Sequence, residues 1–105
     1  TYNKLVRDKI PQIIMQEGKR FKLNSISKGE FNSELKNKLI EEVEEYINTA
    51  NNQDALEELA DVLEVITALA ECHESTMDEI ESTRVENRES KGGFEEKVFL
   101  VHVED

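Results

Sequence analysis

Two acidic clusters lie within segments of strong helical periodicity and limit how this chain can fold. The first contains Glu42 and Glu45 and the second contains Glu58 and Asp61, so each pair is three residues apart. Residues three apart on a helix are neighbours, with Cβ atoms about 5–6 Å apart. If the two helices face each other, four carboxylates share a small volume. Such a group needs a counter-charge, because each negative charge makes the others harder to ionise.

Apolar spacing and capping signals predict the two helices that carry these clusters. A Ser-x-x-Glu capping box at 27–30 opens the first. Asp54 is predicted to cap the second, which runs to about Cys72. The short polar turn 51–53 between them predicts an antiparallel hairpin. The apolar stripes consist of Phe31, Leu35, Leu39, Val43, Ile47 and Ala50 on the first helix, and of Ala55, Leu59, Val62, Leu63, Val65, Ile66, Leu69 and Ala70 on the second.

The rest of the chain predicts two further, weaker elements of helix. One is entered at Ile10–Pro11 and ends at Gly18, a residue suited to a left-handed cap. The other begins near Thr76 and ends near Glu89. The run 98–103 is rich in strand-forming residues and is either a strand or an apolar tail packed on the helices.

We therefore expect one all-α domain over residues 1–105. It is an antiparallel helical hairpin or bundle of about four helices, with a short C-terminal extended segment. The hydrophobic fraction of 37% is low for a self-sufficient globule of this length. We expect oligomerisation to complete the bundle.

Helix geometry sorts the glutamates of the first cluster by the face they occupy. Glu42 borders the apolar stripe, Glu45 lies at its edge, Glu41 is intermediate and Glu44 points to solvent. In the second cluster, Glu58 and Asp61 also flank the apolar stripe. Carboxylates that lean inward from two helices favour a hard divalent cation with oxygen ligands, and Mg²⁺ commonly combines carboxylates with substrate phosphates.

The net charge of −11 argues against nucleic acid as a partner, because binding there depends on Lys and Arg neutralising phosphates. No apolar run approaches the roughly 18 residues of a membrane span, and no signal-peptide pattern opens the sequence. The single cysteine, Cys72, excludes an intramolecular disulfide. These features predict a cytoplasmic protein that contacts neither membrane nor nucleic acid.

The acidic pattern resembles that of a known enzyme family. Glu41-Glu42-x-x-Glu45 followed by Glu58-x-x-Asp61 is similar to the motif of the all-α, MazG-like nucleoside triphosphate pyrophosphohydrolases, which are related to phosphoribosyl-ATP pyrophosphohydrolase and the dimeric dUTPases. The opening residues 2–11 resemble the start of one MazG-like subgroup, and residues 88–94 resemble the basic Gly-Gly-Phe ending common there. The resemblance covers nearly the whole chain.

The resemblance implies an enzyme that uses Mg²⁺, with Mn²⁺ as a substitute, to cleave a nucleoside triphosphate into a monophosphate and pyrophosphate. It makes Glu42, Glu45, Glu58 and Asp61 the metal ligands. Glu41 or Glu45 would be the catalytic base. It also implies phosphate binding by Arg88 and Lys91 and assembly as a homodimer or homotetramer. The implied role is removal of unwanted nucleotides, with base and sugar preference left open.

Two alternatives remain. One is hydrolysis of phosphoribosyl-ATP in histidine biosynthesis, which the opening segment disfavours because it resembles the MazG-like branch. The other is a non-catalytic acidic helical module that binds a partner protein or buffers divalent ions. That alternative predicts that the four carboxylates of the two clusters are dispersed.

Overall fold

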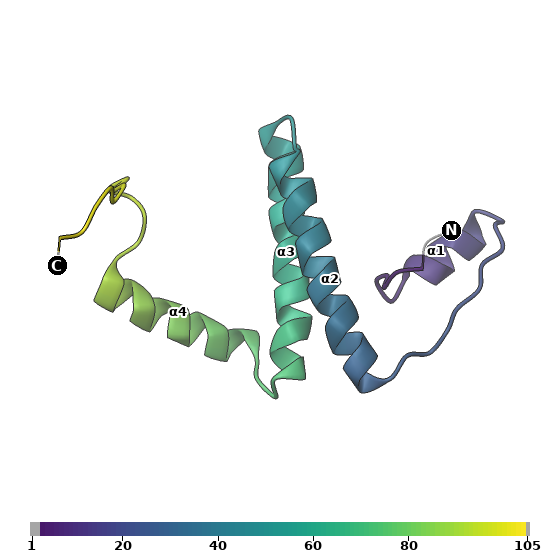
Figure 1. Cartoon of the computed structure of the whole chain (residues 1–105). Coiled ribbons are helices and arrows are strands. Elements are labelled where there is room, and N and C mark those ends of the chain that lie inside the picture. The colour runs from purple at the N-terminus through teal and green to yellow at the C-terminus, as the bar shows by residue number, and fades with distance from the viewer. Residues whose placement is uncertain (1–2, 105) are drawn as a thin grey trace.

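The computed structural model describes residues 3–104 and contains four helices (Figure 1). They are α1 (Ile10–Gln16), α2 (Lys28–Ile47), α3 (Asn52–Cys72) and α4 (Met77–Lys91). Over the described range no strand is present, so the all-α prediction is confirmed. Tyr2, part of the opening motif, lies outside the described residues.

The capping signals account for where α2 and α3 begin. The Ser27 hydroxyl accepts a hydrogen bond from the Glu30 amide at 3.1 Å, and the Glu30 carboxylate accepts one from the Ser27 amide at 3.2 Å. Helix α3 is capped by Asn51, whose side-chain oxygen accepts from the Asp54 amide at 2.9 Å. The prediction of Asp54 as the cap is therefore wrong. Asn and Asp cap about equally well, and Asn51 comes earlier in the chain.

The two outer helices follow the local signals closely. Pro11 lies in the first turn of α1, where its missing N–H costs no helical hydrogen bond. Gly18 follows α1 with a φ of 75°, the left-handed conformation that glycine adopts without strain. Helix α4 begins after Thr76, whose hydroxyl accepts from the Glu79 amide at 3.2 Å, and it ends at Gly92 with a φ of 85°.

Helices α2 and α3 form the packed centre of the described chain. They lie against each other along their lengths and are joined by residues 48–51, whereas α4 touches α3 only near their connection (Figure 1). The most buried apolar side chains belong to this pair and are Leu35, Val65 and Ala70. Helices α1 and α4 lie on opposite sides of the pair, so the acidic clusters sit in the central element.

Large apolar side chains remain exposed on both central helices. On α2 they are Ile40, Val43 and Ile47, and on α3 they are Leu56, Leu59 and Leu63. Both sets follow i, i+3, i+7 spacing, so each forms one stripe along its helix. Half of the apolar stripe predicted for α2 is therefore not buried within the chain.

The chain is far more open than a compact domain of its size. Its accessible surface is 9482 Å², whereas a folded monomer of this mass has about 6,000 Å². Its radius of gyration is 18.1 Å, against about 13 Å for a compact domain of this length. About 3,500 Å² of extra surface per chain is therefore open to solvent.

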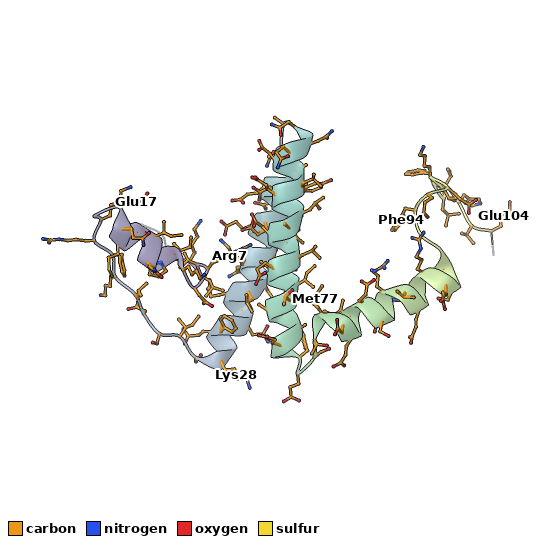
Figure 2. All side chains as sticks on the ribbon, turned by 180° about the vertical axis from the view of Figure 1, so that it is seen from behind. Arg7, Glu17, Lys28, Met77, Phe94 and Glu104 are labelled. Atoms are coloured by element: carbon orange, nitrogen blue, oxygen red, sulfur yellow. The ribbon has the colours of Figure 1, made fainter. Side chains whose placement is uncertain are left out.

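The C-terminal segment does not follow the sequence prediction. Residues 98–103 form no strand, and their apolar side chains are largely exposed, with Phe99 at 89%. Phe94 is also exposed, and the segment that it begins stands away from α2 and α3 (Figure 2). Neither predicted alternative, a strand or a tail packed on the helices, occurs within this chain. Among the described residues no helix is long and apolar enough to cross a membrane.

Candidate metal centre

Three carboxylates from the two central helices converge on one point. Glu42 projects from α2, and Glu58 and Asp61 project from α3. One oxygen of each lies within 4.8 Å of the others. The structure thus brings the two acidic motifs together. The acidic-module alternative predicts that these carboxylates are dispersed, which differs from this arrangement.

Two oxygen atoms of this cluster are buried without a hydrogen-bond partner. They are the Oε2 atoms of Glu42 and Glu58. The Glu42 side chain is only 9% exposed, and its other oxygen lies 3.5 Å from the Lys38 ammonium. A buried carboxylate oxygen without a donor carries a large desolvation cost. The arrangement is therefore incomplete without a positive charge near these oxygens.

The remaining glutamates of the first cluster differ in exposure. Glu45 is exposed but lies close enough to Glu42 and Glu58 to perturb both carboxyls. Glu41 is half-buried and accepts a hydrogen bond from the Lys4 ammonium at 3.0 Å. Glu44 is exposed. Helix geometry thus predicted the burial of Glu42 and the exposure of Glu44 correctly. It was wrong on the order of the other two, because Glu45, expected closer to the apolar stripe than Glu41, is the more exposed of them.

The crowding raises the pKa values of two carboxyls. Burial, hydrogen bonding to Glu45 and the negative charges of Glu45 and Asp61 raise the pKa of Glu58 to about 7. Burial, followed by the negative charge of Glu45, raises the pKa of Glu42, although Lys38 acts in the opposite direction. By contrast, the hydrogen bond from Lys4 lowers the pKa of Glu41.

These shifts predict that the metal-free protein loses stability as the pH rises from about 4.5 to about 7. Because the folded-state pKa of Glu58 lies above its ordinary value, the folded state binds this proton more tightly than the unfolded state. The stabilising effect of this proton is complete at a pH below the unfolded-state pKa, and it is lost as the pH rises through the folded-state pKa. Thermal unfolding in EDTA should give a higher Tm at pH 5 than at pH 8, at one fixed protein concentration. A Tm that rises over this interval would contradict the assignment.

The donor set suits a small hard cation. Ligand oxygens lie about 2.1 Å from Mg²⁺, so two oxygens on one ion are at most about 4.2 Å apart. The cluster oxygens are within 4.8 Å, close to that limit, and all belong to carboxylates. The unpartnered oxygens of Glu42 and Glu58 would gain a counter-charge. Glu45, at the exposed edge, is the fourth carboxylate available to the group.

Three basic residues that were not predicted as part of the site lie beside the cluster. Lys38 is one helical turn from Glu42 on α2, a spacing visible in the sequence. Lys4 reaches Glu41, and the Arg7 guanidinium lies 2.8 Å from Asp61 Oδ1. The last two pairs join residues 37 and 54 positions apart, so only the tertiary structure could reveal them.

Arg88 and Lys91, predicted to bind phosphate, are not brought to the cluster within this chain. Both lie in the last turn of α4, at the end farther from α3 (Figure 1). The Arg88 guanidinium donates to the Glu95 carboxylate and packs against Gly93, where a Cβ atom would collide with it. Gly93 thus leaves room for this position of the flexible Arg88 side chain, whereas Gly92 is accounted for by its positive φ of 85°.

An open hollow of about 590 Å³ adjoins the cluster on the side of the turn between α2 and α3. Its charged lining is entirely acidic. Lys38 and Arg7 contact the cluster at Glu42 and Asp61, and Lys4 and Lys38 contact Glu41 at the border between the cluster and the hollow. The hollow is lined by Glu41, Glu44, Glu45, Asn48, Thr49, Ala50, Asp54, Glu57 and Glu58.

Comparisons with protein-family models, with curated proteins and with solved structures give no match for this chain.

Proposed function

We propose that this protein is a divalent-cation-dependent nucleoside triphosphate pyrophosphohydrolase. The observation that carries the proposal is the convergence of Glu42, Glu58 and Asp61, with buried carboxylate oxygens that have no donor. The spacing of these residues resembles the MazG-like motif. The net charge of −11 supports a small phosphate-bearing substrate over nucleic acid, because metal ions can offset the charge at one site but not over a whole surface.

Glu42, Glu58 and Asp61 would hold Mg²⁺ or Mn²⁺, with Glu45 completing the set from the exposed edge. When bound, the cation would neutralise phosphate charge and activate water for attack. Of the two candidates for the general base, the environment favours Glu45. Lys4 and Lys38 engage Glu41 and favour its ionised form, which makes it a weaker base. Glu45 would accept the proton of water as the phosphoanhydride bond between the α and β phosphates breaks and pyrophosphate leaves.

We also propose that the protein acts as a homodimer or homotetramer in which α2 and α3 form an antiparallel hairpin that packs on that of a second copy. The exposed stripes of α2 and α3 support this, as does the surface excess of about 3,500 Å² per chain. Burying half of that excess on each of two chains would give an interface of about 3,500 Å² in total, within the range of about 2,000–5,000 Å² typical of obligate dimers. Arg88 and Lys91 could then reach phosphate only if α4 of a second copy brings them to the cluster. The proposed setting is the cytoplasm, where the enzyme would remove unwanted nucleotides.

The test is pyrophosphate release from a panel of canonical and modified nucleoside triphosphates, with phosphoribosyl-ATP included. Each reaction is run with Mg²⁺, with Mn²⁺ and with EDTA, and the monophosphate product is identified by chromatography. We expect release from one or a few nucleotides, only with a divalent cation. Release from phosphoribosyl-ATP alone would select the histidine-pathway alternative. No release from any compound would overturn the proposal and leave the acidic-module alternative.

A further inference from the structure

Two cations from the segment before α1 form ion pairs at the carboxylate cluster, one with Asp61 of the cluster and one with the neighbouring Glu41. The Lys4 ammonium lies 3.0 Å from Glu41 Oε1, and the Arg7 guanidinium lies 2.8 Å from Asp61 Oδ1. Their side chains are 41% and 55% exposed. Exposed ion pairs are weak because water and salt screen them, so each of these two contacts can exchange for another at little cost.

Once substrate enters, the negative charge at the site exceeds what bound divalent cations neutralise. The cluster and its edge carry the carboxylates of Glu42, Glu45, Glu58 and Asp61, and a nucleoside triphosphate adds about four negative charges near pH 8. One or two divalent cations do not neutralise this total. The hollow on the side of the turn offers only acidic charges. The remaining positive charge in contact with the cluster comes from Lys38 and the segment 4–7.

Arg7 and a divalent cation compete for the same carboxylate. Asp61 belongs to the convergent group, and its Oδ1 atom is the one that Arg7 contacts. Entry of a cation therefore weakens the hold of Asp61 on Arg7. The planar guanidinium fork fits phosphate oxygens in the same two-pronged way that it fits a carboxylate. A phosphate chain bound at the cation would present those oxygens within reach of Arg7.

We propose that Lys4 and Arg7 are phosphate-binding residues of this site. Without substrate they pair with Glu41 and Asp61, and they exchange these carboxylates for substrate phosphate when a divalent cation and the nucleotide bind. This inference rests on the proposed function and extends it to residues outside the acidic motif. It makes the segment before α1 part of the substrate site. The cations act first as counter-ions and then as ligands of the phosphate chain.

The test measures two binding reactions by titration calorimetry, with MnCl₂ alone and with inorganic tripolyphosphate in saturating Mn²⁺. For Arg7→Gln we expect Mn²⁺ alone to bind two- to fivefold more tightly, because a competitor of up to about 1 kcal/mol is removed. For Arg7→Gln and Lys4→Gln we expect tripolyphosphate to bind roughly ten- to hundredfold more weakly, the effect of losing a charged hydrogen bond. The matched control, Lys9→Gln, removes an exposed cation of the same segment and should change neither constant.

The opposite signs for Arg7→Gln separate phosphate binding from a merely structural role. If the substitution weakens Mn²⁺ and tripolyphosphate alike, Arg7 only holds the segment in place and the inference fails. Arg7→Lys, which keeps the charge without the fork, should recover part of the tripolyphosphate affinity. If wild type binds Mn²⁺ and releases pyrophosphate, but both Gln variants bind tripolyphosphate normally, this inference alone falls. If wild type does not bind Mn²⁺, the proposed function falls with it.

Discussion

Replacing Glu58 by glutamine is expected to lower cation-dependent pyrophosphate release by at least about a hundredfold. The same change is expected to raise the Tm of the metal-free protein at pH 8. Both effects have one cause: burial, together with the neighbouring carboxylates of Glu45, Asp61 and Glu42, raises the pKa of Glu58 to about 7. At pH 8 its charge is unfavourable unless a cation is present. Glutamine keeps the size of the side chain but removes the negative charge, and with it the carboxylate that would bind the cation.

The measurements are initial rates of pyrophosphate release with Mg²⁺ and thermal unfolding in EDTA and in Mg²⁺. Wild type should gain stability from Mg²⁺ by mass action, and Glu58→Gln should gain little. Glu64→Gln is the matched control, because Glu64 is an exposed acid on the same helix outside the cluster. It should retain the wild-type rate and the Mg²⁺ effect. A Glu58→Gln protein with normal activity would remove Glu58 from the site.

Replacing Leu63 by lysine is expected to raise the dissociation constant of the proposed dimer by at least about a hundredfold. Leu63 is 53% exposed in the single chain and belongs to the apolar stripe of α3 with Leu56 and Leu59. Fully burying a leucine contributes about 1.5–3 kcal/mol. About half of this amount is at stake for Leu63, and the loss counts twice in a two-fold symmetric dimer. The desolvation of two lysine ammonium groups at the contact adds to it, which gives about 3 kcal/mol or more in total.

Sedimentation equilibrium over a range of protein concentrations measures this effect. Gln53→Lys is the matched control, since it adds the same charge to an exposed residue of α3 outside the apolar stripe. It should leave self-association unchanged. If Leu63→Lys assembles like wild type, the stripe is not the contact between copies. A wild-type protein that stays monomeric at high concentration would leave its exposed apolar surface without the proposed partner.

Local sequence signals determined the helices themselves. The capping box at Ser27, the proline of α1 and the glycine after it act within a few residues, so they can be read without knowledge of the fold. Periodicity also ranked Glu42 as the inward carboxylate, because the 3.6-residue repeat fixes which side chains share a face. The prediction of the α3 cap failed at Asp54 because Asn51, an equally good cap, lies three residues earlier.

The apolar pattern did not indicate what packs against the apolar faces of the helices. Val43, Ile47 and Leu63 have the spacing of core residues yet are exposed in the single chain. A hydrophobic stripe indicates that a face needs burial but not whether the same chain supplies the partner. For the same reason, the strand-forming residues of the tail at 98–103 did not indicate whether this chain supplies a surface for it to pack on.

The sequence by itself determined which helices form and that Glu42 leans inward, because both properties depend on neighbours within a few residues. Only the tertiary structure decided that Glu42 meets Glu58 and Asp61, leaving oxygens of the two glutamates unpartnered, and that Arg7 pairs with Asp61 and Lys4 with Glu41. It also placed Arg88 far from them within one chain. These are contacts between segments distant in the sequence, and they depend on how helices and connecting segments pack, which no local pattern specifies.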